Sequence, residues 1–283
     1  VFYNNVDNPL VINDYRKIKK FVQKKMNSKI DICTFNVGAA SEYPHCFLNI
    51  DRDKEKNRIV KQSVENAKKK LNIIQPDIFF PSGGTYQICG KFSKLNKFRA
   101  LLKPKLFKKI KYKKTKTLNL LGGRSINLNG KETLIRRKKL GNSLSTKKIN
   151  KINYFYQSEK DVNYSKLNNL FKSSSIEYFR RLKKFKISNS WDLRFFIYHD
   201  LRLNNLGKID KSKSKLLQTY KLKYQNKKKH SVLILHLDAT LFYNLLRRKI
   251  SWNGAISGSF ILYERKPNVF FPDLTWSLNF LTI

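Results

Sequence analysis

Residues 1–105 alternate between two hydrophobic patterns, and this alternation restricts the possible folds more than any other feature of the chain. Residues 10–25 carry apolar side chains at helical spacing and lead into the β-rich run 30–35. A second helical pattern over 59–71 leads into the apolar run 78–80. Strands that alternate with helices and end in glycine-containing loops are typical of a layered α/β sheet with its site at the strand ends. We therefore expect an α/β fold.

The remainder of the chain has a different character in two parts. Residues 106–230 are predicted to form a basic, partly helical insertion, in which 191–196 is interpreted as an amphipathic segment that docks aromatic side chains onto a core. Residues 231–283 are predicted to form a compact strand, helix and strand unit that completes the fold. In that unit 232–237 is the expected buried strand, Asp238 is the expected cap of the following helix, and 259–263 is the expected second strand.

The charge of the chain is strongly positive. It carries 60 Lys and Arg residues against 19 Asp and Glu, a formal net charge of +41, which favours an anionic partner or substrate. Of the basic residues 46 are Lys and 14 are Arg, a bias that A+T-rich codons would also produce. Residues 97–151 hold 19 basic residues and one acid, and they either follow a nucleic acid backbone or form a solvated insertion.

The compartment is inferred from the cysteines and from hydropathy. Three cysteines without close pairing make neither a disulfide framework nor a metal knuckle, so we expect a reducing, cytoplasmic location. No apolar run approaches the roughly 20 residues of a membrane span, so no transmembrane segment is expected. The chain opens on a strand pattern at Val1, and Met26 is its one methionine, so we expect it to be a C-terminal fragment.

Common catalytic signatures are mostly missing from the sequence. There is no phosphate-binding glycine loop, dinucleotide fingerprint, nucleophile elbow or His-Glu-x-x-His helix. The four histidines are scattered, and His236, inside an apolar strand, is interpreted as a hydrogen-bonded core histidine. His45 and Cys46 are weak candidates for a nucleophile pair, because sequence neighbours on a strand point apart.

Three loop motifs follow the predicted strands in order. Residues 3–8 place Asp7 just past the first strand, 36–44 form a small-residue loop that ends in Glu-Tyr-Pro, and 81–86 read Pro-Ser-Gly-Gly-Thr-Tyr. This order resembles the C-terminal half of the metallo-β-lactamase fold. It is similar in particular to the sugar-processing branch that includes lactonase-type enzymes acting on ascorbate 6-phosphate and the hydrolase-like domain of CMP-N-acetylneuraminate hydroxylase. The tail motifs 252–259 and 263–268 are similar to the C-terminal end of the same hydroxylase-like proteins.

The resemblance implies a fold, a function and a set of site residues. The implied fold is the C-terminal half of a layered αββα metallo-β-lactamase-like fold with a basic insertion and a small C-terminal α+β unit. The implied function is that of a metal-dependent hydrolase or hydroxylase-like protein acting on an acidic sugar or sugar nucleotide. Asp7 is the implied metal ligand. The implied substrate-binding residues are Ser41, Tyr43, Ser82, Gly83, Gly84, Thr85, Tyr86 and Arg265.

The sequence also departs from the family pattern. The His-x-His-x-Asp-His loop that begins the family's metal site does not occur, and Ser82 stands where many members carry a ligand histidine. A divalent metal (Zn, Fe or Mn) is therefore expected only if further ligands lie upstream, since such sites need three or more protein ligands. Two alternatives stay open: a nucleic-acid-binding or ribosome-associated basic protein, and a metal-free scaffold of the same fold.

Each implied site residue also has a purely structural interpretation. Asp7 satisfies a turn, and Gly83 with Gly84 forms a tight turn. Tyr43 packs on Phe47, and Arg265 pairs with a nearby carboxylate rather than with a substrate anion. Trp252, in the tail motif, is expected to fill the core.

Overall fold

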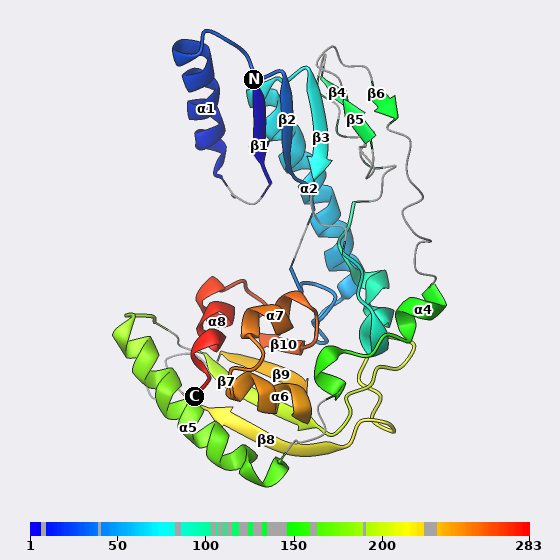
Figure 1. The fold of residues 1–283 in the computed structure, drawn as a ribbon, viewed down its shortest axis with the longest axis vertical. Coiled ribbons are helices and arrows are strands. Elements are labelled where there is room, and N and C mark those ends of the chain that lie inside the picture. Colours follow the sequence, from blue (N-terminus) through cyan, green and yellow to red (C-terminus); the bar gives the residue numbers. More distant parts are fainter. Residues whose placement is uncertain are drawn as a thin grey trace. The chain divides into compact units, whose positions relative to one another are not determined.

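The protein is a mixed α/β chain with two four-stranded sheets and several helices within its described part (Figure 1). The computed structural model describes residues 1–6, 10–38, 41–82, 86–102, 106, 110, 112, 115–118, 124–126, 132–134, 146–158, 163–188, 191–223 and 231–283. Contacts divide the chain into two compact units, each built from several segments. Unit 1 comprises 1–40, 53–86 and 100–143, and unit 2 comprises 41–52, 87–99 and 144–283.

Unit 1 is built on a parallel sheet with the strand order β1-β2-β3-β4. The strands are β1 (Phe2–Asn5), β2 (Ile32–Asn36), β3 (Ile78–Ser82) and β4 (Lys116–Thr117). Helix α1 (Ile12–Lys25) connects β1 to β2, and helix α2 (Arg52–Ile74) precedes β3. This order confirms the alternation predicted from the sequence. A separate antiparallel pair is formed by β5 (Arg124–Ile126) and β6 (Glu132–Leu134).

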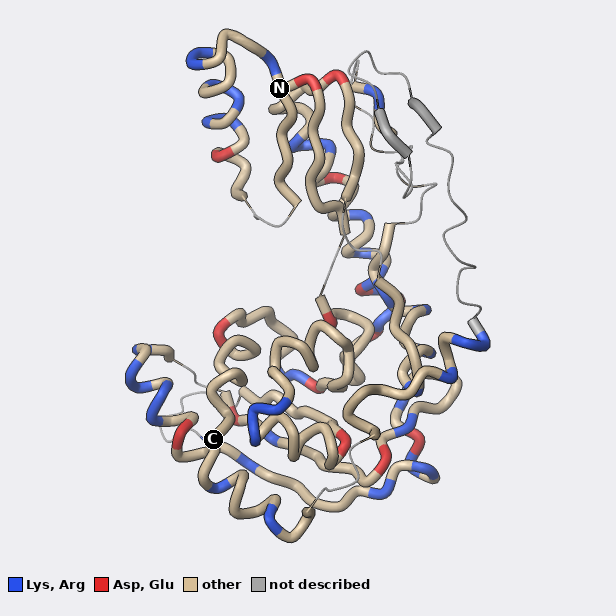
Figure 2. Tube along the Cα trace, viewed as in Figure 1, with Lys and Arg blue, Asp and Glu red and all other residues tan. Residues whose placement is uncertain are grey.

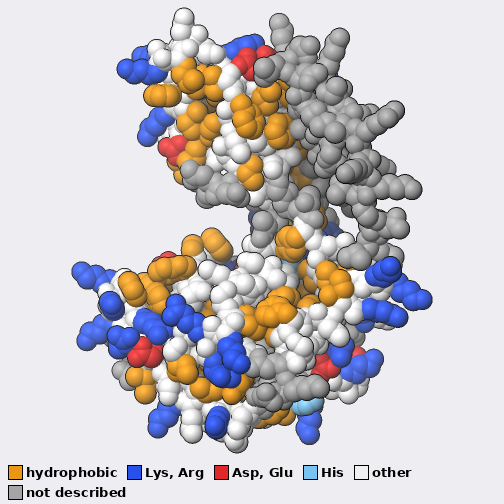
Figure 3. Space-filling model, viewed as in Figure 1, with side chains coloured by type: hydrophobic (Ala, Val, Ile, Leu, Met, Phe, Trp, Pro, Cys, Tyr) orange, Lys and Arg blue, Asp and Glu red, His pale blue; other side chains and the backbone are white. Residues whose placement is uncertain are grey.

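Both α1 and α2 pack on the same face of this sheet. Their contact face on the strands consists of Cys33, Phe35 and Phe79, which are buried together with Tyr15 of α1 and Leu71 of α2. The opposite face of the sheet holds Phe2, which is 58% exposed and stacks on Phe80. Figure 3 shows hydrophobic side chains gathered over the strands of unit 1 on the side turned to the viewer.

Unit 2 is built on a mixed sheet with the strand order β10-β9-β7-β8. The strands are β7 (Asp192–Tyr198), β8 (Leu216–Leu222), β9 (Val232–Asp238) and β10 (Leu262–Lys266), and only the β7–β9 pair is parallel. Alternate residues of the central strands are buried on one face. There Phe195 of β7 contacts Phe171, Phe242 and Trp252 from three helices.

Three helices of unit 2, those that carry Phe171, Phe242 and Trp252, cover this apolar face. The α-helices are α4 (Thr146–Asn150), α5 (Leu167–Lys184), α6 (Ala239–Leu246), α7 (Trp252–Ser257) and α8 (Pro272–Ser277). Short 3-10 helices cover Gly90–Phe98, Phe155–Ser158, Tyr164–Lys166 and Leu278–Phe280. Trp252 is buried and its indole N–H donates to the Leu281 carbonyl at 3.1 Å, which confirms its predicted place in the core. No described helix has the length and hydropathy needed to cross a membrane.

One prediction made from local patterns is confirmed by the structure, and two are corrected. Residues 191–196 dock aromatic side chains onto a core as predicted, since Trp191 and Phe195 are buried, and they do so mostly as strand β7, in which every second side chain is buried. The last strand is β10 at 262–266 rather than 259–263. Asp238 does precede α6, but its side chain makes no capping hydrogen bond because it is held by other partners.

The division of the chain also differs from the one expected. Strands β7 and β8 lie within residues 106–230, yet they share a sheet with β9 and β10 from 231–283. The contacts separate the chain near residues 40, 52, 86, 99 and 143 rather than at 105 and 230. The reason is long-range pairing, which hydrophobic periodicity does not reveal.

Candidate functional site

The three long strands of unit 1 end together at one edge of the sheet. Phe35 of β2 is the register partner of both Asn5 and Pro81, and Asn36 is the partner of Ser82. The Val37 N–H donates to the Ser82 carbonyl at 3.2 Å just beyond the strands. The chain segments that leave β1, β2 and β3 therefore start from the same edge, which is where ligands bind in open parallel sheets. We call Asn5, Asn36 and Ser82 with their neighbours the carboxyl edge.

The face of the unit 1 sheet that α1 and α2 do not cover is polar near the carboxyl edge. Side chains in register share a face, so the partners Asn4 and Thr34 lie on the side opposite to the helices, as do Asn36 and Ser82. Thr34 is 2% exposed. Within the described part of the chain, the Thr34 hydroxyl oxygen and the Asn36 amide oxygen are both buried without a hydrogen-bond partner. Such oxygens cost about 1–3 kcal/mol each, and an outlier of this kind motivates a hypothesis of function.

Only part of the predicted loop cluster falls within the described residues. Ser82 lies at the end of β3, on the carboxyl edge, and Tyr86 belongs to the same unit and is half-buried. Asp7, Gly83, Gly84 and Thr85 lie outside the described residues. The structure thus brings together the starts of the three loops.

Tyr43 and Arg265, also predicted as substrate-binding residues, lie together in unit 2. The Arg265 guanidinium carbon is 5.4 Å from the centroid of the Tyr43 ring and 4.8 Å from that of Phe47. Asn268 joins the pair, since it accepts from Arg265 at 2.9 Å and donates to the Tyr43 hydroxyl at 3.2 Å. The Arg265 Nε is buried without a hydrogen-bond partner in the described chain.

The contacts of Tyr43 and Arg265 also fit a purely structural role for these residues. Tyr43 packs edge-on against Phe47 at 5.0 Å, as the structural interpretation predicted. Burial lowers the pKa of Arg265, and the nearby charge of Glu42 acts against this effect. Burial in turn raises the pKa of the Glu42 carboxyl. Ser41 is exposed and its hydroxyl lies 3.4 Å from the Tyr43 carbonyl oxygen, so Ser41 belongs to the same turn. Arg265 is the charged member that faces aromatic rings.

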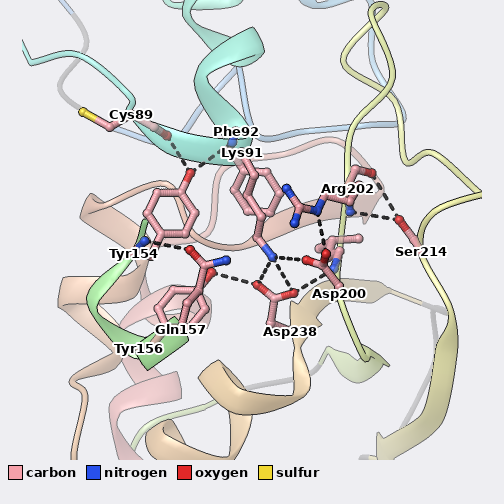
Figure 4. Close-up of polar contacts among 11 residues, drawn as sticks. Cys89, Lys91, Phe92, Tyr154, Tyr156, Gln157, Asp200, Arg202, Ser214 and Asp238 are labelled. Atoms are coloured by element: carbon pink, nitrogen blue, oxygen red, sulfur yellow. Dashed lines mark hydrogen bonds and ion pairs between the residues drawn. The ribbon is translucent and has the colours of Figure 1, made fainter. Parts of the chain in front are cut away.

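A buried ion network in unit 2 was missed from the sequence (Figure 4). The Lys91 ammonium lies 2.7 Å from Asp238 and 2.8 Å from Asp200, and the side chains of Lys91 and Asp238 are each 4% exposed. Asp238 also accepts from the Tyr156 hydroxyl and from the Leu201 N–H, both at 2.7 Å. The signal in the sequence was a lysine within the apolar stripe of Ile88, Phe92 and Leu95.

The charges of this network are compensated by its own members. Burial raises the pKa of Tyr156 well above its usual value, and the Asp238 charge adds to the effect. Burial also raises the pKa of Asp200, but the hydrogen bonds and charges of Lys91 and Arg202 outweigh this and hold it below its usual value. The buried charges of Lys91 and Asp238 neutralise each other. The residues of the network come from four separate segments of the chain, which it therefore joins.

The weak nucleophile pair is not supported by the geometry of unit 2. His45 and Cys46 are both buried, and the His45 Nε2 is 2.9 Å from the Ser259 hydroxyl. Burial lowers the pKa of His45 to about 3, with the charges of Arg99 and Arg52 acting in the same direction. Burial raises the pKa of the Cys46 thiol, so at neutral pH this sulfur is not a thiolate.

The metal implied by the resemblance finds no complete ligand set in the described residues. Among them, no group of three or more His, Cys, Asp or Glu side chains is arranged to hold a metal ion. The oxygens at the carboxyl edge come from Thr34, Asn36 and Ser82, which are neutral and weak ligands for Zn, Fe or Mn. The described residues therefore do not fit such a metal by themselves.

Comparison of the chain with protein-family models, with curated proteins and with solved structures gives no match. The family resemblance inferred from the loop motifs thus stays a prediction.

Proposed function

We propose that this protein binds an acidic sugar or its nucleotide conjugate at the carboxyl edge of the unit 1 sheet, within a metallo-β-lactamase-like fold. The observation that carries the proposal is the pair of buried, unpartnered oxygens of Thr34 and Asn36 at an edge where three loops begin. Sugar hydroxyl groups are the donors that would satisfy these oxygens. The net charge of +41 supports an anionic ligand, because it raises the local concentration of anions.

The layer arrangement supports the finer fold proposal. Helices α1 and α2 both cover one face of the unit 1 sheet, and the opposite face carries the partly exposed Phe2 and Phe80. An αββα fold has this asymmetry, because each of its sheets packs helices on one side and the second sheet on the other. The proposal leaves the hydrolase or hydroxylase chemistry open, since the described residues do not fit the implied metal by themselves.

The proposal is tested by calorimetric titration of the full chain. The probes are CMP-N-acetylneuraminate, free N-acetylneuraminate and the neutral sugar N-acetylmannosamine. We expect binding of the first two and none of the third. The variant Asn36→Leu removes the unpartnered oxygen at nearly constant volume and should weaken binding about tenfold, the value of one hydrogen bond. Asn72→Leu, on the exposed surface of α2, is the matched control and should bind as the parent does.

Two results would overturn the proposal. One is the absence of binding of either acidic probe at millimolar concentration, and the other is an equal effect of the two leucine variants. The nucleic-acid alternative has its own signature. A protein that contacts six or more phosphates loses roughly a thousandfold in affinity between about 50 and 200 mM salt. A salt dependence that steep with DNA or RNA, together with no sugar binding, would favour the alternative.

A further inference from the structure

The sheet of unit 2 has a pocket on the face that its helices do not cover. The pocket has a volume of about 530 Å³, within the usual range for small-molecule sites. His236 is the register partner of Phe196 on β7 and of Leu262 on β10, and it lies in the wall. The full lining is Leu48, Tyr198, Lys208, Ile209, Lys211, Ser214, Leu216, His236 and Glu264.

A hydrogen-bonded triad forms the polar part of this wall. His236 is 5% exposed, and both of its ring nitrogens are engaged, which confirms the predicted hydrogen-bonded core histidine. Its Nε2 is 3.0 Å from Glu264 Oε1, and its Nδ1 is 3.1 Å from the Tyr198 hydroxyl. The hydrogen bond from His236 lowers the pKa of Glu264, so this carboxyl is ionised at neutral pH.

The ionised carboxylate sets the direction of its hydrogen bond with His236. Glu264 can only accept, so the His236 Nε2 carries the proton and donates it. The Nδ1 of the same ring lies 3.1 Å from the Tyr198 hydroxyl, whose oxygen keeps a lone pair for a ligand in either direction of that hydrogen bond. Two acceptor groups are left for a ligand: the lone pairs of the Tyr198 oxygen and Glu264 Oε2, to which the described residues donate no hydrogen bond.

The rest of the lining supplies positive charge and apolar surface. Lys208 and Lys211 form no ion pair with any residue that the structure describes, because Asp210 between them bonds Ser212 and Lys213 instead. The apolar lining residues are Leu48, Ile209 and Leu216. Carboxylate acceptors beside apolar side chains match a sugar ring, which presents hydroxyl groups at its rim and C–H bonds on its faces.

We propose that this pocket is a second binding site, specific for a hydroxylated organic anion of sugar size. The carboxylate or phosphate of the ligand pairs with Lys208 and Lys211. Its hydroxyl groups donate to Glu264 and Tyr198, and the face of its ring lies against Ile209 and the neighbouring apolar side chains. The site lies wholly in unit 2 and does not depend on the proposed function of unit 1.

The test uses the full chain and three probes in calorimetric titrations at one salt concentration. Glucuronate carries the anion as a carboxylate, glucose 6-phosphate carries it as a phosphate, and glucose carries none. We expect both anions to bind and glucose to bind at least tenfold more weakly. The tighter of the two anions identifies the source of the charge.

Matched variants separate a built site from general attraction to a basic protein. The double variant Lys208→Met with Lys211→Met should weaken anion binding at least tenfold. The control, Lys183→Met with Lys186→Met, removes the same charge from exposed positions on and just after α5 and should change it less than twofold. Glu264→Gln should weaken glucuronate binding but not the weak binding of inorganic phosphate, which lacks ring hydroxyls.

Three outcomes would overturn this inference: no binding of either anion, equal losses in the two double variants, or unchanged glucuronate binding in Glu264→Gln. Glucuronate also belongs to the class of ligand proposed for unit 1, so the variants distinguish the two sites. Asn36→Leu removes a group of the other unit and should leave binding of glucuronate in this pocket unchanged.

Discussion

Replacing Lys91 with methionine tests whether the buried ion network holds unit 2 together. Methionine keeps the length of the side chain and removes its charge, so the Asp238 carboxylate, 4% exposed, loses the ammonium 2.7 Å away. It retains the hydrogen bonds from Tyr156 and Leu201, which do not neutralise it. Breaking one side of a buried ion pair costs about 3–5 kcal/mol. Asp200 adds little, because it is partly exposed and still pairs with Arg202.

This cost should be visible as a shift in melting temperature. For a unit of this size each kcal/mol lowers the melting temperature by about 2–4 °C, so we expect a fall of roughly 10 °C by calorimetry. Adding Asp238→Asn to Lys91→Met removes the unpaired charge and should recover part of the loss. Lys172→Met, on the exposed surface of α5, controls for the loss of a lysine. If Lys91→Met melts within about 2 °C of the parent, the network does not stabilise the fold as argued.

Three further predictions concern single side chains. Thr34→Val replaces an unpartnered buried hydroxyl with a methyl group. The free energy of unfolding in urea should stay unchanged or rise by about 1 kcal/mol. A loss of about 2 kcal/mol would show that the hydroxyl has a hydrogen-bond partner. The pKa of His45 is about 3 in the folded protein, so the unfolded state binds more protons below pH 6.5. Through His45, the free energy of unfolding should therefore fall by about 2 kcal/mol between pH 7 and pH 5. In urea titrations at these two pH values, the loss measured for His45→Gln should be smaller than that of the parent by this amount. Gly207 has φ +69°, and an added Cβ would lie 2.8 Å from the Phe98 ring and 3.4 Å from the Arg52 guanidinium. Gly207→Ala should therefore lower the free energy of unfolding by about 1–3 kcal/mol. A neutral effect would contradict this close packing.

Local patterns predicted the elements of unit 1 but not the arrangement of unit 2. Apolar side chains at helical spacing followed by short apolar runs were sufficient for α1, β2 and β3, because each pattern is complete within one segment. The pattern of 191–196 predicted the burial of Trp191 and Phe195, but it did not show that the segment is strand β7. Its partners β8 and β9 are fixed by pairing across long stretches of chain, and the sequence alone does not encode that pairing in any local pattern.

The candidate sites show the same division. The loops after β1, β2 and β3 could be predicted to start at one edge, because parallel strands place their ends together. The resemblance implied that Tyr43 and Arg265 both bind substrate, but their mutual contact was not predicted, since the two residues are far apart in the chain. Lys91 was hidden among many lysines, and only its apolar neighbours set it apart.

The interleaved segments of unit 2 have a consequence for the synthesis of the protein. Phe47 stacks on Tyr263 of β10, and Asn49 exchanges hydrogen bonds with the Arg265 backbone. Residues 41–52 therefore cannot reach these native neighbours until the more than 200 residues up to β10 have left the ribosome. Contacts between residues so far apart in the sequence slow folding and leave apolar surface exposed until they form. Phe47 therefore lacks its stacking partner until β10 has been synthesised.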